Sequence, residues 1–372
     1  MTWESEKNEF LEPTYRLFAD FYQSSTAITQ LLVLIIIYFA VSSFIIVIVL
    51  FIVRYIRIKQ SVAIRTLMIN YNEMITKYTF EEFKEVRLFD EVNSNFKRKI
   101  FLKSLDQFHS NISGEYSIVL EGIYEFMHLD IIAISYCKSK KWHHQVFGIK
   151  VIGNFKDMNN TWHVQNGLKS KSPHVRIQAE LSMIKLYPKS PLFFLDDYNF
   201  PISDWAQINL FSALEHTPGI FIPDFSQWYM HKVISLSIFS IRMTATFNQA
   251  FNIDKLLGLL TNTNEEYRKE VLISLMKFDD NKILEKAKEM FEKETNNNKI
   301  ILLDILSKYD DLDTFNFLES LISSETNNHI LFHTAKALSA YGREGKSKIA
   351  VFALNCSNIH LKNGITYLLK NY

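Results

Sequence analysis

Cysteine, glycine and proline are scarce in this sequence of 372 residues. Only two cysteines, Cys137 and Cys356, are present, which argues against a disulfide framework and agrees with a reducing compartment. Ten glycines and seven prolines are few turn formers for this length, and six of the prolines lie between Pro173 and Pro223. Because sheet proteins need frequent turns, this composition predicts an all-α chain.

An excess of charge of either sign is also missing. The chain has 41 Lys and Arg against 40 Asp and Glu, a formal net charge of +1. A general nucleic-acid binder usually carries a clear basic excess, so no nucleic-acid partner is expected.

One stretch lacks charge altogether, since no charged residue occurs between Asp20 and Arg54. Residues 31–53 contain only Ser42 and Ser43 as polar residues. As a helix this run would be about 35 Å long, enough to cross a hydrocarbon core of about 30 Å. A core helix of a soluble protein would seldom run so long without charge, and a signal peptide would be shorter and preceded by basic residues. The sequence therefore predicts a single transmembrane helix over 27–53.

The flanks of this run predict its orientation. Residues 1–26 contain two basic residues, whereas residues 54–65 contain four basic residues and no acid. Basic residues stay on the cytoplasmic side, so we expect a single-pass protein of the inner (cytoplasmic) membrane with its N-terminus outside. Residues 1–26 would form a short outer segment with an interfacial helix or a frayed tail, and 54–110 a juxtamembrane helical stalk in the cytoplasm.

Beyond the stalk, aromatic residues recur at the ends of amphipathic segments. Successive markers are 32, 60, 31, 31, 32 and 31 residues apart, and the step of 60 holds two repeats with Thr217 as the intermediate member. The positions three and six residues before each marker are mostly apolar and share one helix face. A shorter helix fits between markers, so the pattern predicts an α-solenoid of helix pairs, with an accidentally spaced helical bundle as the alternative. The aromatic markers are Phe155, Tyr187, Phe247, Phe278, Tyr309, Tyr341 and Tyr372.

Two segments resemble the HEAT-repeat family. Residues 173–179, PHVRIQA, are similar to the proline, Val-Arg and alanine that begin a first helix in that family, and 264–270, NEEYRKE, is a looser copy. The resemblance covers 141–372, with 111–140 as a degenerate first unit, so we expect a HEAT-like α-solenoid over 111–372. With its predicted membrane helix, the chain resembles the bacterial membrane-anchored HEAT-repeat proteins. This resemblance implies a scaffold that serves a membrane glycosyltransferase or a polysaccharide assembly system.

No residue is predicted to be catalytic or to bind a cofactor or metal. The segment 340–347, AYGREGKS, matches a relaxed phosphate-loop pattern, but a repeat helix precedes it where that loop needs a buried strand. His329 and His333 have metal-ligand spacing on a helix without an evident third ligand. We expect an inter-repeat turn in the first case and packing or surface histidines in the second.

One cluster of basic residues predicts a binding surface. An offset of 31 superimposes Lys138 on Lys169, Lys140 on Lys171 and His143 on His174. Equivalent positions of stacked repeats lie side by side, so these residues would form one edge that meets anionic lipid headgroups or an acidic partner. The alternative is a set of solvated turn lysines without a partner. This "basic edge" comprises Lys138, Lys140, Lys141, His143, Lys169, Lys171, His174 and Arg176.

Together these features predict a membrane-anchored cytoplasmic scaffold that binds membrane-associated protein partners and makes or breaks no bond. Some HEAT-like proteins are bilin lyases or DNA glycosylases, so the fold leaves an enzyme as one alternative. A single-pass protein that transmits a signal is another. The oligomeric state and the partner's identity stay open.

Overall fold

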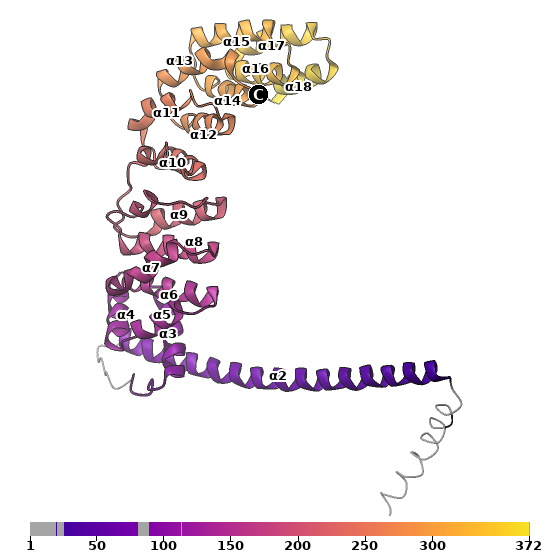
Figure 1. Cartoon of the computed structure of the whole chain (residues 1–372). Coiled ribbons are helices and arrows are strands. Elements are labelled where there is room, and N and C mark those ends of the chain that lie inside the picture. The colour runs from indigo at the N-terminus through magenta and orange to yellow at the C-terminus, as the bar shows by residue number, and fades with distance from the viewer. Residues whose placement is uncertain (1–19, 21–25, 81–88, 113, 372) are drawn as a thin grey trace, which may run out of the picture. The chain divides into compact units, whose positions relative to one another are not determined.

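The structure is a computed structural model that describes residue 20 and residues 26–80, 89–112 and 114–371, the side chains of 28 and 371 excepted. Every regular element in this part of the chain is a helix, which confirms the all-α prediction (Figure 1). The chain divides into two compact units, Met1–Leu129 and Asp130–Tyr372.

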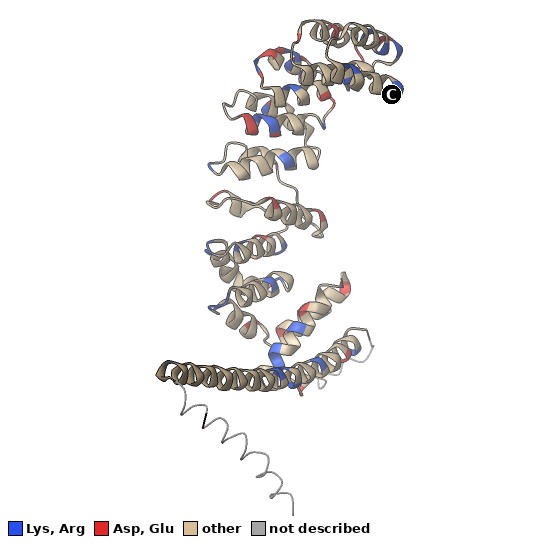
Figure 2. Ribbon diagram, turned by 90° about the vertical axis from the view of Figure 1, so that its right-hand side faces the viewer, with Lys and Arg blue, Asp and Glu red and all other residues tan. Residues whose placement is uncertain are grey.

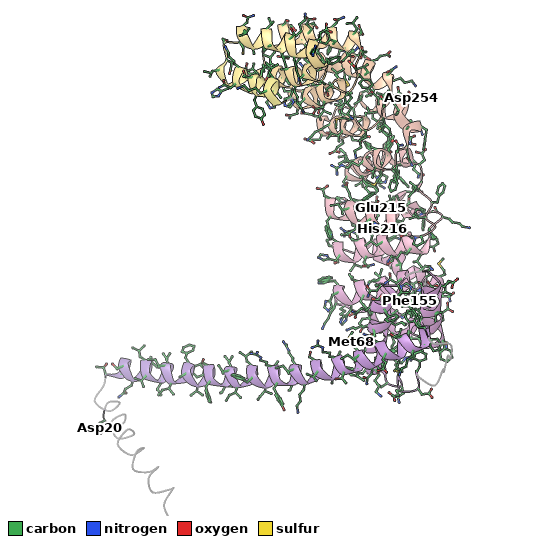
Figure 3. The ribbon with its side chains drawn as sticks, turned by 180° about the vertical axis from the view of Figure 1, so that it is seen from behind. Asp20, Met68, Phe155, Glu215, His216 and Asp254 are labelled. Carbon is green, nitrogen blue, oxygen red and sulfur yellow. The ribbon has the colours of Figure 1, made fainter. Side chains whose placement is uncertain are left out.

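Unit 1 contains the apolar run on one continuous helix. Helix α2 (Ala27–Phe80) has 54 residues, so the predicted span and the first part of the predicted stalk form a single element. It is the one helix, among the described residues, that is long and apolar enough to cross a membrane. Its side chains project into open space along the apolar run (Figure 3). The hydroxyl of Ser42 donates to the carbonyl oxygen of Tyr38, 2.5 Å away, so it needs no other partner. The predicted outer segment 1–26 lies outside the described residues apart from Asp20 and Thr26.

The C-terminal part of α2 is docked in unit 1. It packs against α3 (Asn95–His109), and the buried ring of Tyr71 lies edge-on to that of Phe101, with 5.4 Å between their centroids. Helix α3 in turn packs against α4 (Glu115–Phe126). Arg98 of α3 donates to the carbonyl oxygens of Met127 and His128, which end α4. The predicted boundary between 110 and 111 therefore falls inside unit 1, which includes α4.

Unit 2 consists of eight successive pairs. The second member of every pair is a helix, and most of these second helices pack against the next one along the chain, as α6 on α8 and α14 on α16. Six pairs begin with a first helix: α5 (Asp130–Cys137), α7 (Thr161–Leu168), α11 (Ile253–Leu259), α13 (Asn281–Met290), α15 (Leu312–Ser324) and α17 (Gly342–Asn355). The second helices are α6 (Trp142–Asn154), α8 (Pro173–Leu186), α9 (Asp204–His216), α10 (Ile234–Thr246), α12 (Glu265–Leu275), α14 (Asn296–Leu306), α16 (Asn328–Ser339) and α18 (Ile359–Asn371).

The third and fourth pairs have a short 3₁₀ turn in place of a first helix. These turns are η3 (Phe193–Leu195) and η4 (Phe225–Trp228), before α9 and α10. Proline lacks a backbone N–H and cannot sit inside a helix, and five prolines occupy these two loops. They are Pro188, Pro191, Pro201, Pro218 and Pro223.

The aromatic markers end the second helices. Phe155, Tyr187, Phe247 and the intermediate member Thr217 directly follow α6, α8, α10 and α9. The next three markers, Phe278, Tyr309 and Tyr341, lie within three residues of the ends of α12, α14 and α16. Phe155 is the residue directly after α6, and Lys156 then adopts a left-handed conformation with φ 51°. The N–H of Asp157 donates to the carbonyl of Ile152, which completes a Schellman stop. The predicted repeat register is therefore confirmed in this part of unit 2, while Tyr372 lies outside the described residues.

The arginines of the two HEAT-like segments have the same structural role. Arg176 donates from Nη1 to the carbonyl oxygen of Ser170 at 2.9 Å, and Arg268 donates in the same way to Asn262 at 2.9 Å. Gln145, one repeat before Arg176, donates to the carbonyl of the residue six positions earlier, at 2.7 Å. A polar side chain on the first turn of a second helix thus ties down the turn that precedes it.

Candidate partner-binding edge

The eight residues of the basic edge lie at two equivalent turns of unit 2. Residues 138–141 connect α5 to α6, and 169–172 connect α7 to α8. The five lysines and both histidines of the edge are exposed. The indole ring of Trp142 stacks on the imidazole of His174, with 4.7 Å between centroids and 28° between planes. The two turns therefore lie side by side, which is the arrangement that the 31-residue offset predicts.

The lysines of this edge have no carboxylate partner within the described part of the chain. Some lysines farther along unit 2 are paired: Lys282 Nζ lies 2.6 Å from Asp254 Oδ1, and Lys336 Nζ lies 3.1 Å from Asp304 Oδ1. Residues 130–178 contain eight Lys and Arg against two Asp, and Figure 2 shows mostly blue at these turns. The edge is thus a local positive surface on a chain of nearly neutral net charge. Its unpaired lysines are Lys138, Lys140, Lys141, Lys169 and Lys171.

Arg176 differs from the other members of the edge. Its guanidinium donates to two turn carbonyls and lies over the ring of Phe200, 4.3 Å from the centroid. These contacts hold the α7–α8 turn against the loop that follows α8. The side chain therefore has a structural role, and the lysines supply the accessible charge.

Two exposed tryptophans extend the edge and were missed by the sequence-based prediction. Trp142 begins α6 with half of its surface exposed, and Trp205, on the first turn of α9, is 67% exposed. The signal was present in the sequence, because His143, His174 and Trp205 are each 31 residues apart. Helix α8 packs against α9, so the edge continues from basic and histidine side chains to an indole ring.

No family model and no curated protein sequence matches this chain. Among solved structures, YibA of Escherichia coli matches with a TM-score of 0.35 and 16% identity, over 81% of this chain and 96% of YibA. Human deoxyhypusine hydroxylase in complex with glycerol matches with a TM-score of 0.28 and 10% identity, over 82% of this chain and 96% of that chain. Both TM-scores are low, so the description of the fold rests on this chain's own helices and contacts.

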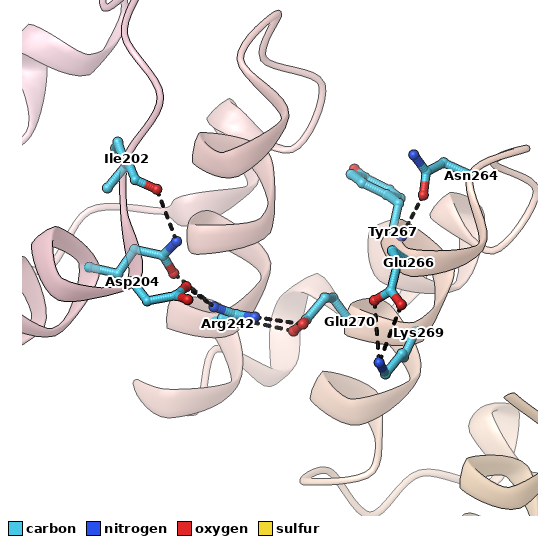
Figure 4. A network of polar contacts seen from close by, with 9 residues as sticks. Ile202, Asp204, Arg242, Asn264, Glu266, Tyr267, Lys269 and Glu270 are labelled. Carbon is cyan, nitrogen blue, oxygen red and sulfur yellow. Dashed lines mark hydrogen bonds and ion pairs between the residues drawn. The ribbon is translucent and has the colours of Figure 1, made fainter. Parts of the chain in front are cut away.

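Beyond α9 several charged side chains are paired inside the array (Figure 4). Arg242 of α10 donates from Nε and Nη2 to the carboxylate of Glu270 on α12, at 2.8 and 2.6 Å. Its Nη1 donates to the side-chain oxygen of Gln207 on α9 at 2.9 Å. Hydrogen bonds with Glu270 raise the pKa of Arg242. One guanidinium therefore links three successive second helices, and this charge is not available to a partner in the way that the edge lysines are.

The phosphate-loop pattern belongs to the turn between α16 and α17. Gly342 has φ 63°, a left-handed conformation that favours glycine. A Cβ on Gly345 would lie 1.8 Å from the carbonyl oxygen of Leu338, so only glycine allows α17 to approach the end of α16. Both glycines of the pattern are explained by this turn, as the sequence predicts.

The histidine pair and the first cysteine also have structural surroundings. The rings of His329 and His333 lie 5.0 Å apart on α16, and no group of three or more His, Cys, Asp or Glu in the described chain could hold a metal ion. Burial, and then the charge of His329, lower the pKa of His333, which favours its neutral form. Burial raises the pKa of Cys137 to about 12, so this thiol is protonated and a poor nucleophile at neutral pH.

Proposed function

We propose that this protein is a membrane-anchored scaffold whose cytoplasmic unit 2, a HEAT-like α-solenoid, binds an acidic protein partner along the basic edge. The observation that supports the binding proposal best is the row of unpaired lysines beside stacked and exposed aromatic rings. Several lysines elsewhere in unit 2, such as Lys282, Lys336 and Lys348, are paired with carboxylates of neighbouring repeats. Clustered like charges repel one another, so a partner with negative charge would account for the placement of these lysines side by side.

The anchor in this proposal is α2. Residues 27–53 would cross the bilayer of a bacterial inner membrane, with the N-terminus outside. Lys59 Nζ lies 5.0 Å from the ring centroid of Tyr55, just beyond the apolar run. Basic and aromatic side chains at this point suit the headgroup region of the cytoplasmic leaflet. The helix then continues into the packed part of unit 1, so the anchor and this folded part share one continuous helix.

The proposed mechanism is binding alone. Helical arrays expose long surfaces, and a membrane anchor raises the effective concentration of such a surface near membrane-bound partners. The aromatic rings would supply apolar contact area, and the lysines would steer and orient an acidic segment. A membrane glycosyltransferase or a polysaccharide assembly system, which the family resemblance implies, is the first partner to test.

Charge reversal with a matched control tests the edge. The full chain is expressed in its host membrane as a variant with Glu at Lys140, Lys141, Lys169 and Lys171, and partners are recovered in mild detergent and identified by mass spectrometry. The control variant places Glu at four lysines outside the edge for which the described part of the chain shows no ion pair: Lys277, Lys346, Lys362 and Lys370.

The proposal predicts that the edge variant loses a partner that the control variant retains, and that added salt weakens recovery of this partner by the unaltered chain. Equal recovery by both variants would contradict it. Binding to vesicles that contain anionic lipid tests whether the edge binds the membrane surface instead. If the solubilised chain binds these vesicles through the same four lysines, and no protein is lost from the edge variant, the edge binds lipid headgroups.

A further inference from the structure

The third and fourth pairs of unit 2 break the repeat. Where the other six pairs have a first helix of 7 to 14 residues, these two have only η3 and η4 within proline-containing loops. A surface pocket of about 370 Å³ opens between the two loops. Sites that depart from an otherwise regular pattern are the first place to look for a function.

Two exposed phenylalanines form part of the pocket wall. Phe193 is 39% exposed and Phe221 is 62% exposed. The Phe221 N–H donates to the carbonyl oxygen of Pro188 at 2.8 Å, which ties the two loops together. The ring of Phe193 lies edge-on to that of Tyr187, with 5.1 Å between centroids. The rings are therefore held in place rather than carried on free loops.

A carboxylate faces these rings and is held by a buried indole. Trp228, which also lines the pocket, is 3% exposed and donates from Nε1 to Oδ1 of Asp196 at 2.8 Å. Among the described residues none forms an ion pair with Asp196, although Lys189 lies on the same lining. Asp224, the other acid of the lining, is used internally, since its Oδ1 accepts from Asn252 at 2.7 Å and its Oδ2 lies 3.5 Å from Lys255. Asp196 is thus the acidic charge available to a ligand, and a buried donor holds it in place, whereas no contact described for the exposed Lys189 does the same.

We propose that this pocket binds a lysine or arginine side chain of a partner polypeptide. The aliphatic stem and cationic head would contact Phe193 and Phe221, and the head would pair with Asp196. This proposal deepens the proposed function, because it rests on unit 2 being a protein-binding array. The basic edge would bind acidic residues and the pocket would bind a basic side chain. A partner that contacts both surfaces would therefore carry an acidic segment and a basic segment.

A cation suits this pocket better than the alternatives do. An apolar side chain would bury the Asp196 charge with only the Trp228 N–H to compensate it, which is costly, and an anion would be repelled by it. A basic side chain offers apolar atoms to the rings and a charge to the carboxylate at once. A pocket of about 370 Å³ is also at the lower end of the range for specific ligands, which fits one side chain rather than a helix.

Capped pentapeptides test this proposal on the full chain in detergent micelles. The probes are acetyl-Ala-Ala-X-Ala-Ala-amide with X as arginine, lysine, citrulline or norleucine. Binding is followed by the indole N–H resonance of Trp228 in ¹⁵N-tryptophan-labelled protein, assigned with Trp228→Phe. One side chain in an open site should give a dissociation constant on the order of millimolar.

Four variants localise the effect. Asp196→Asn removes the charge but keeps an acceptor for Trp228, and Asp197→Asn alters a neighbouring exposed acid that does not line the pocket. Phe221→Ala removes a wall, and Phe251→Ala removes an equally exposed phenylalanine one repeat away. Unchanged circular dichroism, and for the Asn and Ala variants a retained Trp228 resonance, show that the fold persists.

The proposal predicts saturable shifts with the arginine and lysine peptides and at least about fivefold weaker binding of citrulline and norleucine. Asp196→Asn and Phe221→Ala should weaken arginine binding by a similar factor, with both control variants unchanged. Equal binding of citrulline and arginine, equal losses in the control variants, or no saturation would overturn it. None of these outcomes depends on the lysines of the basic edge, so either proposal can fail without the other.

Discussion

The hydroxyl of Tyr341 donates a hydrogen bond to the backbone carbonyl of Tyr309, 2.5 Å away and 32 residues earlier. The hydroxyl of Tyr309 donates in the same way to the carbonyl of Asp280, 3.0 Å away. Each of these aromatic markers therefore bonds the loop that ends the preceding second helix. Stability in an array of this kind comes from such contacts between neighbours.

Tyr341→Phe removes one of these contacts while keeping the ring. The ring still packs on Phe315, whose centroid is 5.3 Å away, so the loss should be that of one hydrogen bond, about 1 kcal/mol. Denaturant unfolding followed by circular dichroism measures it. Tyr116→Phe, at a tyrosine for which no hydrogen bond is described, should leave stability unchanged. Equal effects of the two substitutions would show that the Tyr341 hydroxyl contributes nothing.

Buried tyrosines predict a loss of stability at high pH. Burial raises the pKa of Tyr267 to about 12, and burial followed by Asp311 and Asp310 raises the pKa of Tyr341 to about 12. A raised folded-state pKa gives stability that is fully present below the ordinary tyrosine pKa of about 10 and is lost as pH rises toward 12. Tyrosinate absorbance and helical circular dichroism should therefore change together above pH 10. Complete titration with the helices intact would contradict this.

Much of the repeat was predictable from sequence, because local chemistry fixes it. Phe155 and Tyr341 mark helix ends, and Ile152 and Leu338, three residues earlier, are fully buried as the register predicts. The spacing of apolar residues and the residues that end a helix are local features of the sequence, so a single sequence is enough to recognise them. The boundary between the units was not readable in this way, since it depends on which of α3, α4 and α5 pack together.

Gly345→Ala should destabilise the last pairs strongly. The new Cβ would lie 1.8 Å from the Leu338 carbonyl, so α17 must move away from α16, at a cost of about 3 kcal/mol or more. Gly258→Ala is the control, because no atom lies within 4 Å of its Cβ position and it is inside α11. That substitution should be neutral or stabilise by up to about 1 kcal/mol. Thermal unfolding of both variants distinguishes the effect of the close contact between α17 and α16 from the general effect of replacing a glycine.

The ion pair of Arg268 and Glu294 predicts both a mutational and an acid effect. Arg268 Nε lies 2.6 Å from Glu294 Oε1, and the carboxylate is 4% exposed. Arg268→Ala leaves that carboxylate buried without its partner and should cost about 3 kcal/mol, whereas removing the exposed Lys269 should cost less than about 0.5 kcal/mol.

The same pair sets the sign of the acid dependence. Burial works to raise the pKa of Glu294, but hydrogen bonds from Arg268 and Asn298 outweigh it and lower the pKa. A lowered folded-state pKa gives stability that is present above the ordinary glutamate pKa of about 4.3 and is lost as pH falls below it. Unfolding curves of the unaltered chain should weaken below that pH. Those of Arg268→Ala should lose less over the same range, and parallel curves for the two proteins would contradict the assignment.

The candidate sites were only partly predictable, for a physical reason. The basic edge could be predicted from the 31-residue offset, because the repeat register alone determines which turns lie side by side. The pocket beside Asp196 is formed by two loops in which prolines prevent a helix. The repeat register predicts where the helices lie but not the conformation of such loops. The hydrogen bond from Trp228 to Asp196 joins residues 32 apart, but only the packed loops reveal which oxygen is left free.

The apolar run of α2 predicts a graded response to arginine. In this run of 23 residues, all apolar except Ser42 and Ser43, each large aliphatic or Phe residue gains about 0.3–0.6 kcal/mol on insertion, and one central arginine costs about 3 kcal/mol, so a single substitution should be tolerated. Three, at Val41, Phe44 and Val47, should reverse the balance and move the protein from the carbonate-resistant membrane fraction to the soluble or degraded fraction. Arginines at Ile56, Ile58 and Val62, which are equally exposed on α2 but beyond the run, should leave it in the membrane. If both triple variants fractionate alike, residues 27–53 do not anchor this protein, and an N-terminally shortened product would identify them as a cleaved signal sequence instead.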